Sequence, residues 1–330
     1  MSSYDELEEK ARENLLKEAE EKPFINGGFK PMDRERLESE FITHHNFVPI
    51  PQDELPSKSY FYDKGTQVLV KSASVQEVKH FSSINDEDFF DIQDKMSTLF
   101  NVCVRISKNG NPVSYRDLSE FDKIYVFFAV RERTFLADGR QSTISHKSPC
   151  PHCGEEINIE IEKGNLGYYS IPDSIMKFYD DNTRSFVINH DKFESSLEIF
   201  VPTVGVTEKI FQYIKEAEIK KQRGEGGYYD LADLTIIMYI TKDWRDIDDN
   251  GKYIKRKLED IKRWSVDKYK VATHVTKTLK VGVDPMMEIR CSKCGKESRV
   301  PVRFPEWSTL LSDESIIGEL FGDSSQTDIR

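Results

Sequence analysis

The spacing of apolar and polar residues changes along the chain and predicts helices first, then a region of mixed helices and strands. Asp5–Glu21 repeats apolar residues at helical spacing ahead of Pro23, which predicts a charged helix with a thin apolar face. Residues 23–58 are rich in proline, glycine and polar residues, with one short helix expected near Asp33–Phe41. Residues 1–58 are therefore predicted to form an extended N-terminal arm.

Residues 59–140 are expected to form a mainly helical domain with a short strand at Gln67–Val70. Asn85 is the expected N-cap of a helix whose apolar face places Cys103 in the core. Ser119 is expected to open a second helix, with Asp122 at its N3 position. That second helix is apolar nearly all round, so it should lie at the centre of the domain.

Residues 141–305 are expected to form a second domain with an insertion at about 165–280. The strict alternation of Ile157–Ile161 predicts a half-buried strand. The insertion is expected to be α/β, with strands at Ser185–Ile188 and Leu197–Val201 and helices near 206–217, 230–242 and 265–280, the last capped by Ser265. Two further strands are expected at Met286–Arg290 and Ser298–Arg303, and residues 306–330 are expected to be a C-terminal tail.

Two Cys-x-x-Cys-Gly motifs, called knuckles below, carry the chemistry of this sequence. They account for four of the five cysteines: Cys150, Cys153, Cys291 and Cys294. Two residues between thiolates let both sulfurs reach one ion at about 2.3 Å, and the glycine supplies the positive φ that the turn needs. No secretory signal precedes them, so a reducing compartment is expected, where such pairs bind metal rather than form disulfides.

The four thiolates predict one structural zinc ion per chain, although iron also binds such ligands. The ion would connect knuckles that lie 137 residues apart. His146 and His152 flank the first knuckle and are alternative ligands. Four thiolates leave no open position for water, so the site is predicted to be structural and the protein is predicted not to be an enzyme.

Together these features predict an α+β protein in which a helical N-terminal domain is followed by a zinc ribbon. The two knuckles of the ribbon would be separated by the α/β insertion.

One other motif suggests a ligand site but does not complete one. Asp246-x-Asp248-x-Asn250-Gly251 resembles the start of a calcium-binding loop, yet Lys257 occupies the position that requires a glutamate. We predict instead a turn at Asp249–Gly251 between two short strands.

Net charge and hydropathy narrow the possible partners. The net charge of -11 disfavours general binding to nucleic acid, although Lys252–Arg263 forms a local basic patch. No apolar run reaches the roughly 20 residues of a membrane helix, so no membrane partner is expected.

Three blocks of sequence surround the knuckles in a recognisable order. They are Asp117-Leu118 with Asp122–Tyr125 and Val130–Glu132, then the strand after the first knuckle with Ile199–Thr203, then Val281–Asp284 with Ile289–Phe304. In this order, residues 60–305 resemble contractile-tailed bacteriophage proteins, the T-even-type baseplate hub and baseplate assembly family. The resemblance implies a protein of the virion tail baseplate, or of the host cytoplasm during assembly, that binds other tail and baseplate proteins and no small-molecule substrate.

Two other classes of function remain open at this stage. A zinc-ribbon nucleic-acid-binding or transcription-accessory protein is the first, and the acidic net charge argues against it. A metal-dependent hydrolase is the second, and it requires an open ligand position on the metal.

Overall fold

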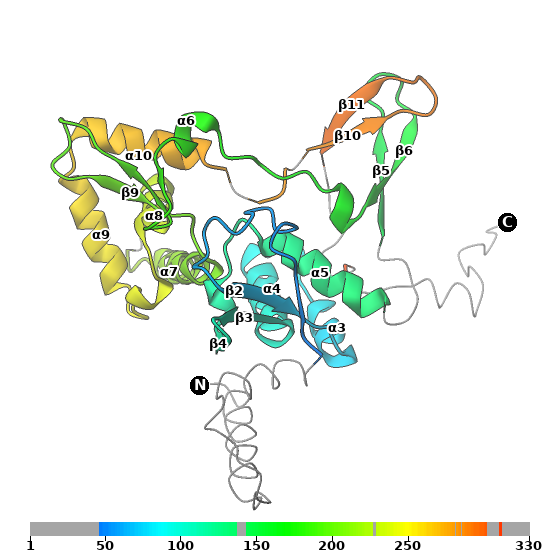
Figure 1. Cartoon of the computed structure of the whole chain (residues 1–330), viewed down its shortest axis with the longest axis horizontal. Coiled ribbons are helices and arrows are strands. Elements are labelled where there is room, and N and C mark those ends of the chain that lie inside the picture. Colours follow the sequence, from blue (N-terminus) through cyan, green and yellow to red (C-terminus); the bar gives the residue numbers. More distant parts are fainter. Residues whose placement is uncertain are drawn as a thin grey trace, which may run out of the picture. The chain divides into compact units, whose positions relative to one another are not determined.

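The computed structural model describes residues 46–136, 143–226, 229–280, 282–284, 286–301 and 310–311 (Figure 1). The chain divides into Met1–Leu37 and Glu38–Arg330, and every described residue belongs to the second unit. The helices expected at Asp5–Glu21 and Asp33–Phe41 lie outside the described residues. No helix in the described part of the chain is long and apolar enough to cross a membrane.

The first part of the fold combines a small antiparallel sheet with three helices. The sheet has the order β1 (Val48–Pro49), β2 (Thr66–Val70), β3 (Val104–Lys108) and β4 (Asn111–Val113). The helices are α3 (Val75–Phe81), α4 (Phe89–Cys103) and α5 (Lys123–Leu136). Only β2 among these strands was predicted, so the region expected to be mainly helical contains a sheet as well.

The helix starts in this region differ from the predicted ones. Asp88, not Asn85, is the N-cap of α4, and its carboxylate accepts hydrogen bonds from the N–H groups of Phe90 and Asp91 at 2.9 and 3.3 Å. Asn85 lies three residues before this cap, and its side chain accepts a hydrogen bond from the Glu87 N–H at 3.2 Å. Helix α5 begins at Lys123, so the prediction of a cap at Ser119 was also wrong.

Ser119 does not open α5 because its backbone pairs with Thr203 in an isolated β-bridge. Cys103 is fully buried in the core, as predicted.

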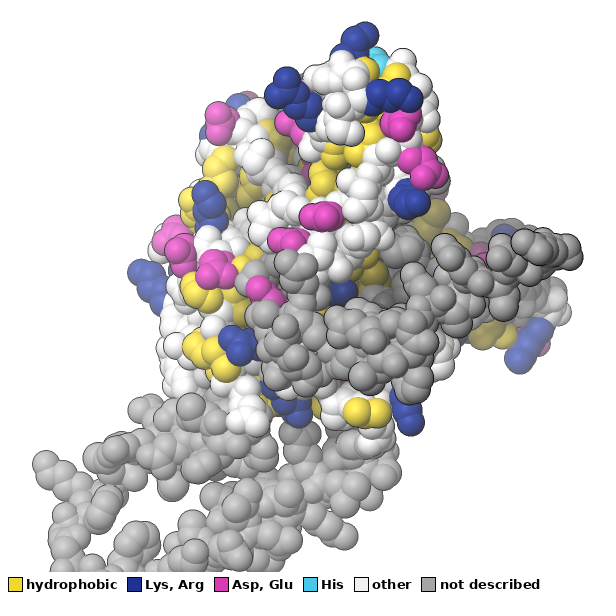
Figure 2. Space-filling model, turned by 90° about the vertical axis from the view of Figure 1, so that its right-hand side faces the viewer, with side chains coloured by type: hydrophobic (Ala, Val, Ile, Leu, Met, Phe, Trp, Pro, Cys, Tyr) yellow, Lys and Arg dark blue, Asp and Glu magenta, His cyan; other side chains and the backbone are white. Residues whose placement is uncertain are grey.

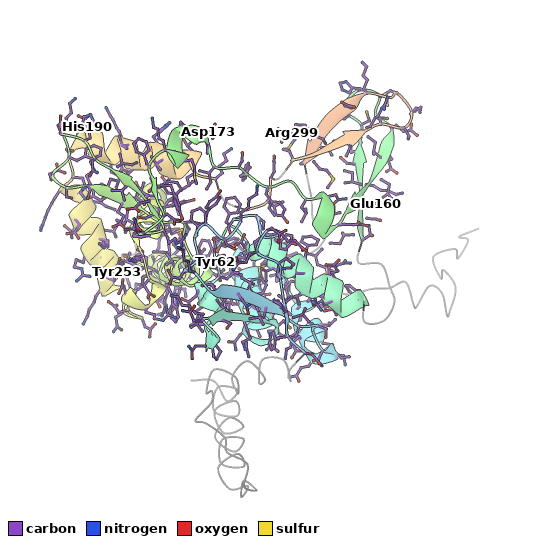
Figure 3. The ribbon with its side chains drawn as sticks, in the orientation of Figure 1. Tyr62, Glu160, Asp173, His190, Tyr253 and Arg299 are labelled. Carbon is purple, nitrogen blue, oxygen red and sulfur yellow. The ribbon has the colours of Figure 1, made fainter. Side chains whose placement is uncertain are left out.

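Asp122, expected to support the start of a helix, holds a distant segment instead. Its carboxylate is fully buried and accepts hydrogen bonds from the Ser57 N–H at 2.8 Å, the Ser57 hydroxyl at 2.7 Å and the Tyr62 hydroxyl at 2.7 Å. Burial raises the pKa of Asp122, and these hydrogen bonds act in the opposite direction. Tyr62 is labelled in Figure 3. The interaction fixes the irregular segment before β2 onto the start of α5.

The insertion builds a second set of elements. It contains α6 (Asp173–Met176), β7 (Tyr179–Asp180), β8 (Ser185–Ile188), β9 (Leu197–Ile199), α7 (Val204–Gln222), α8 (Leu231–Ile240), α9 (Lys252–Lys262) and α10 (Val266–Thr278). The predicted strand Ser185–Ile188 and the Ser265 cap of α10 are confirmed.

The turn at Asp249–Gly251 is not flanked by strands, so that prediction was wrong. A 3₁₀ turn, Trp244–Asp246, precedes it and α9 follows it. The Asp248 carboxylate accepts hydrogen bonds from the first N–H groups of α9, and Gly251 adopts φ 65° immediately before the helix. The acidic residues of this segment therefore start a helix that was not predicted.

Two hydrophobic cores result. The first joins the four-stranded sheet, α4 and α5 to apolar residues of the two knuckle regions, including Ile144, Ile161 and Val300. It also contains Leu310 and Leu311, each 1% exposed, and the Arg131 Nε donates to the Leu310 carbonyl at 2.7 Å. Residues 306–330 were expected to be a tail, but this part of them is packed into the core. The second core is formed mainly by the insertion, and it also contains Phe121 from the first part of the chain.

Contacts between residues 116–117 and the insertion join the first half of the described chain to the second half, which is the insertion. The guanidinium groups of Arg116 and Arg245 both lie over the Trp244 ring, at 5.3 and 4.7 Å from its centre. Arg245 also pairs with Asp117 at 2.6 Å. A Cβ at Gly205 would lie 2.5 Å from the Trp244 ring, so only glycine allows α7 to pack here.

We predict that Asp122→Ala lowers the free energy of unfolding by about 3 kcal/mol, because it leaves three buried donors without an acceptor. Denaturant unfolding measures this value. Asp191→Ala, at an exposed position, is the control and should change stability by less than about 0.5 kcal/mol. Equal effects of the two substitutions would contradict the role assigned to Asp122.

Candidate metal centre

Each knuckle forms the turn of a two-stranded antiparallel hairpin. The first hairpin pairs β5 (Ile144–Pro149) with β6 (Glu156–Ile161), and the second pairs β10 (Met286–Arg290) with β11 (Glu297–Pro301) (Figure 1). The predicted strand Met286–Arg290 is confirmed, and β6 and β11 differ from the predictions only at their ends. Strand β5 was not predicted, since its sequence has one strongly apolar residue, Ile144, and shows no alternation.

The backbone hydrogen bonds are the same in both knuckles. The Gly154 N–H donates to the Cys150 carbonyl at 2.9 Å, and the Gly295 N–H donates to the Cys291 carbonyl at 2.9 Å. The N–H of the first cysteine of each knuckle donates to the carbonyl of the residue after the glycine. These bonds run from Cys150 to Glu155 at 2.8 Å and from Cys291 to Lys296 at 3.0 Å. Both glycines have positive φ, 73° and 68°. Nothing lies within 4 Å of a Cβ built on either, so conformation rather than space requires glycine.

The four sulfur atoms meet at one point between the hairpins. All four lie within 4.8 Å of one another, with 3.9 Å between Cys150 and Cys294 and 3.7 Å between Cys153 and Cys291. Sulfurs at about 2.3 Å from a central tetrahedral ion lie about 3.8 Å apart. The cluster therefore fits one metal ion in a closed four-thiolate shell. The structure brings together all four residues that the sequence predicted as ligands.

The predicted alternative ligands do not complete this group. Among the described side chains, the potential metal-binding cluster consists of the four cysteines alone. His152 contributes its backbone N–H, which donates to the Cys150 Sγ at 3.4 Å. Only the backbone of His146, within β5, is described.

The groups around the sulfurs favour the thiolate form of Cys291 and oppose the thiolate form of Cys153. Hydrogen bonds from the backbone N–H groups of Cys294 and Lys293 lower the pKa of Cys291 to about 7, against the opposing effect of burial. At Cys153 the Glu155 N–H lowers the pKa, but burial and the neighbouring thiols outweigh it and raise the pKa to about 12. Four such groups this close together need a cation before all can be thiolates.

The segments that connect the hairpins to the insertion also pair with each other. Tyr168 and Val283 form a β-bridge, flanked by hydrogen bonds from the Tyr169 N–H to the Gly282 carbonyl at 3.2 Å and from the Asp284 N–H to the Gly167 carbonyl at 2.8 Å. The insertion is thus closed at its base by backbone pairing as well as by the cysteine cluster. No sequence pattern predicts this pairing, because it uses only a few residues on each side.

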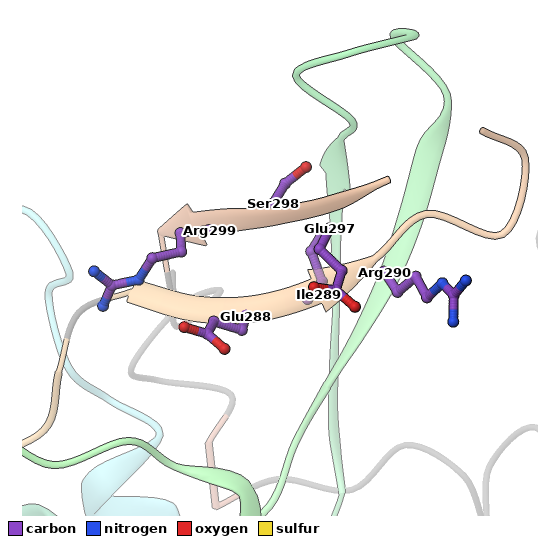
Figure 4. Close-up of a pocket in the computed structure, with 6 residues that line it drawn as sticks. All are labelled: Glu288, Ile289, Arg290, Glu297, Ser298 and Arg299. Carbon is purple, nitrogen blue, oxygen red and sulfur yellow. The ribbon is translucent and has the colours of Figure 1, made fainter. Parts of the chain in front are cut away.

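The exposed side of the second hairpin carries charges of both signs. A surface hollow there is lined by Glu288, Ile289, Arg290, Glu297, Ser298 and Arg299 (Figure 4). The strand register places Glu288 opposite Arg299 and Arg290 opposite Glu297. Figure 2 shows acidic and basic side chains interspersed over the face that includes the hairpins. The described residues of this face therefore form no uniformly basic surface.

Comparisons of the chain with protein-family models, with curated proteins and with solved structures found no match. The resemblance to baseplate proteins accordingly remains a prediction from the sequence.

We predict that Cys291→Ser/Cys294→Ser removes the bound metal and accelerates hydrogen exchange in β5, β6, β10 and β11 at least about tenfold, because the hairpins lose their common ion. The α8 amides belong to the other core and should keep their protection. Hydrogen exchange followed by mass spectrometry measures both regions. Cys103→Ala, outside the cluster, is the control, and unchanged hairpin protection in the double variant would contradict the role of the cluster.

We predict that Gly154→Ala or Gly295→Ala lowers the stability of the metal-loaded protein by about 1 kcal/mol, because alanine is strained at positive φ. Thermal unfolding of each variant tests this. Gly164→Ala is a matched control, since its Cβ would also meet nothing within 4 Å and its φ is not positive. A loss of stability as large in the control would show that backbone conformation is not the reason for glycine in the knuckles.

Proposed function

We propose that the chain is a non-enzymatic structural component or assembly factor of a contractile phage tail baseplate, stabilised by one zinc ion. The order of sequence blocks around the two knuckles supports the baseplate assignment. The observation that carries the non-enzymatic part is the closed shell of four sulfurs, which leaves no position on the metal for water or substrate. Zinc is the proposed ion because tetrahedral four-cysteine shells are typical of structural zinc.

In this proposal the zinc ion acts by fixing two hairpins against each other, as in a zinc ribbon. The β-bridge between Tyr168 and Val283 holds the segment that enters the insertion beside the segment that leaves it. The hairpins and the insertion would then offer preformed surfaces to other tail proteins. A preformed surface loses little conformational freedom on binding, which favours ordered assembly.

The mixed charge of the hairpin face supports protein partners over nucleic acid. Lys147 pairs with Glu156 at 3.4 Å, Arg299 pairs with Asp284 at 2.7 Å, and Lys293 pairs with Glu155. The carboxylates beside these cations repel phosphate, so the hairpin face attracts a nucleic-acid backbone only weakly. A zinc-ribbon nucleic-acid-binding function is therefore the weaker alternative.

Deletion of the gene from the phage that encodes this chain tests the proposal. We expect lysates without assembled baseplates or complete tails by electron microscopy, restored by the wild-type chain and by Cys103→Ala. Cys291→Ser/Cys294→Ser should fail to restore assembly, because it lacks the zinc ligands.

Mass spectrometry of purified wild-type particles then separates the two forms of the proposal. A virion component is present in the particle, and an assembly factor is absent from it. Normal, infectious tails in the deletion lysate would overturn the baseplate function. Salt-dependent retention of a DNA duplex by the purified chain, together with normal tails, would support the nucleic-acid alternative.

A further inference from the structure

Positive charge is concentrated in one stretch of this acidic chain. Residues 252–280 contain ten lysines and arginines against three aspartates and glutamates, a net charge of +7. The whole chain has a net charge of -11, so the remaining residues carry -18. Such asymmetry within one chain points to an interaction with a negatively charged partner.

The fold turns much of this charge toward solvent. Helix α9 buries Tyr253, Ile254 and Ile261, and Figure 3 labels Tyr253 on this helix. The exposed side of α9 and the first turns of α10 carry a group that we call the basic surface: Lys252, Lys255, Arg256, Arg263, Val266 and Lys270.

None of the five cations of the basic surface forms an ion pair with any described residue. Glu259 also lies on the exposed side of α9, where it pairs with Lys262 at 2.7 Å. Val266 adds an apolar group, since it is 68% exposed at the first residue of α10. Protein interfaces combine apolar groups with a polar rim, and Val266 and these cations offer both.

A complementary surface lies at the N-terminal end of α4 and in the residues just before it. Asp86–Asp94 contains five carboxylates and no lysine or arginine. Phe89 lies among them, 48% exposed, with its ring in edge contact with Phe211 at 5.0 Å. We call Glu87, Asp88, Phe89, Asp91 and Asp94 the acidic surface. Asp94 pairs with Lys215, but both side chains are about half exposed or more, so this pair is easily exchanged.

We propose that the basic surface of one copy of this chain binds the acidic surface of a second copy. The two surfaces differ, so the contact is head-to-tail and leaves a free surface of each kind for further copies. At about 0.15 M salt the screening length is about 8 Å, which suppresses repulsion between the net charges. Oppositely charged groups in direct contact retain their attraction. This inference does not depend on the baseplate function.

A protein partner fits this surface better than nucleic acid does. Glu259 and Asp260 interrupt the cations on α9, and phosphates would be repelled by them. A duplex would also extend past the basic surface over a molecule that carries -18 elsewhere. A second copy instead supplies carboxylates together with an apolar residue, Phe89, that matches Val266.

Sedimentation velocity at 0.15 M salt over a concentration series tests the proposal on the full chain. The wild type should form complexes that grow with concentration. Lys255→Glu/Arg256→Glu and Glu87→Lys/Asp94→Lys should each weaken association at least tenfold. A mixture of the two variants should restore association, because each keeps one intact surface. Lys64→Glu/Lys79→Glu makes the same change in charge at exposed lysines outside both surfaces, and should associate like the wild type.

Three results would overturn the proposal: a monomeric wild type at every concentration, variants that associate like the wild type, or a mixture that stays monomeric. A monomeric wild type that retains a DNA duplex, with loss in Lys255→Glu/Arg256→Glu, would assign the basic surface to nucleic acid. Circular dichroism establishes that each variant is folded. If a reversed charge unfolds the chain, Lys255→Ala/Arg256→Ala and Glu87→Gln/Asp94→Asn replace those variants, with the same expected direction.

Discussion

The central constraint on this structure is that four sulfur atoms from two distant turns occupy one small volume. Cys150 and Cys153 belong to one hairpin, and Cys291 and Cys294 belong to another that begins more than a hundred residues later. Four thiolates at this distance repel one another unless a cation lies between them. A bound metal converts that repulsion into the strongest connection between the hairpins. The segment between the two knuckles must then leave the cysteine cluster and return to it.

The fold of the insertion follows from this requirement. Its base is closed by the bridge between Tyr168 and Val283, and most of the second core comes from its own strands and helices. The insertion also packs on the first half of the chain, where the Arg116 guanidinium lies over the Trp244 ring. The hairpins share the first core through residues such as Ile161 and Val300. The metal centre thus joins the two hairpins, whereas other contacts join the insertion to the first half, so loss of the metal should affect the hairpins first.

The sequence predicted which four cysteines cluster and much of the secondary structure, and the reason is that both depend on local patterns. Cys-x-x-Cys-Gly fixes a turn by itself, and Ser265 or Met286–Arg290 can be recognised from a few neighbouring residues. Long-range contacts were not predictable in this way. The role of Asp122 depends on Ser57 and Tyr62, which are about 60 residues away, and burial of Leu310 depends on Arg131. Strand β5 lacks an apolar pattern because its partner β6 supplies most of the buried residues.

X-ray absorption at the zinc edge, recorded on the purified full-length chain with its metal content, tests the central claim most directly. The account predicts one zinc ion per chain with four sulfur neighbours at about 2.3 Å and no nitrogen or oxygen in the first shell. A shell that contains nitrogen or oxygen would contradict the closed four-cysteine site. A chain that binds no zinc when purified under reducing conditions with zinc present would contradict the metal centre itself.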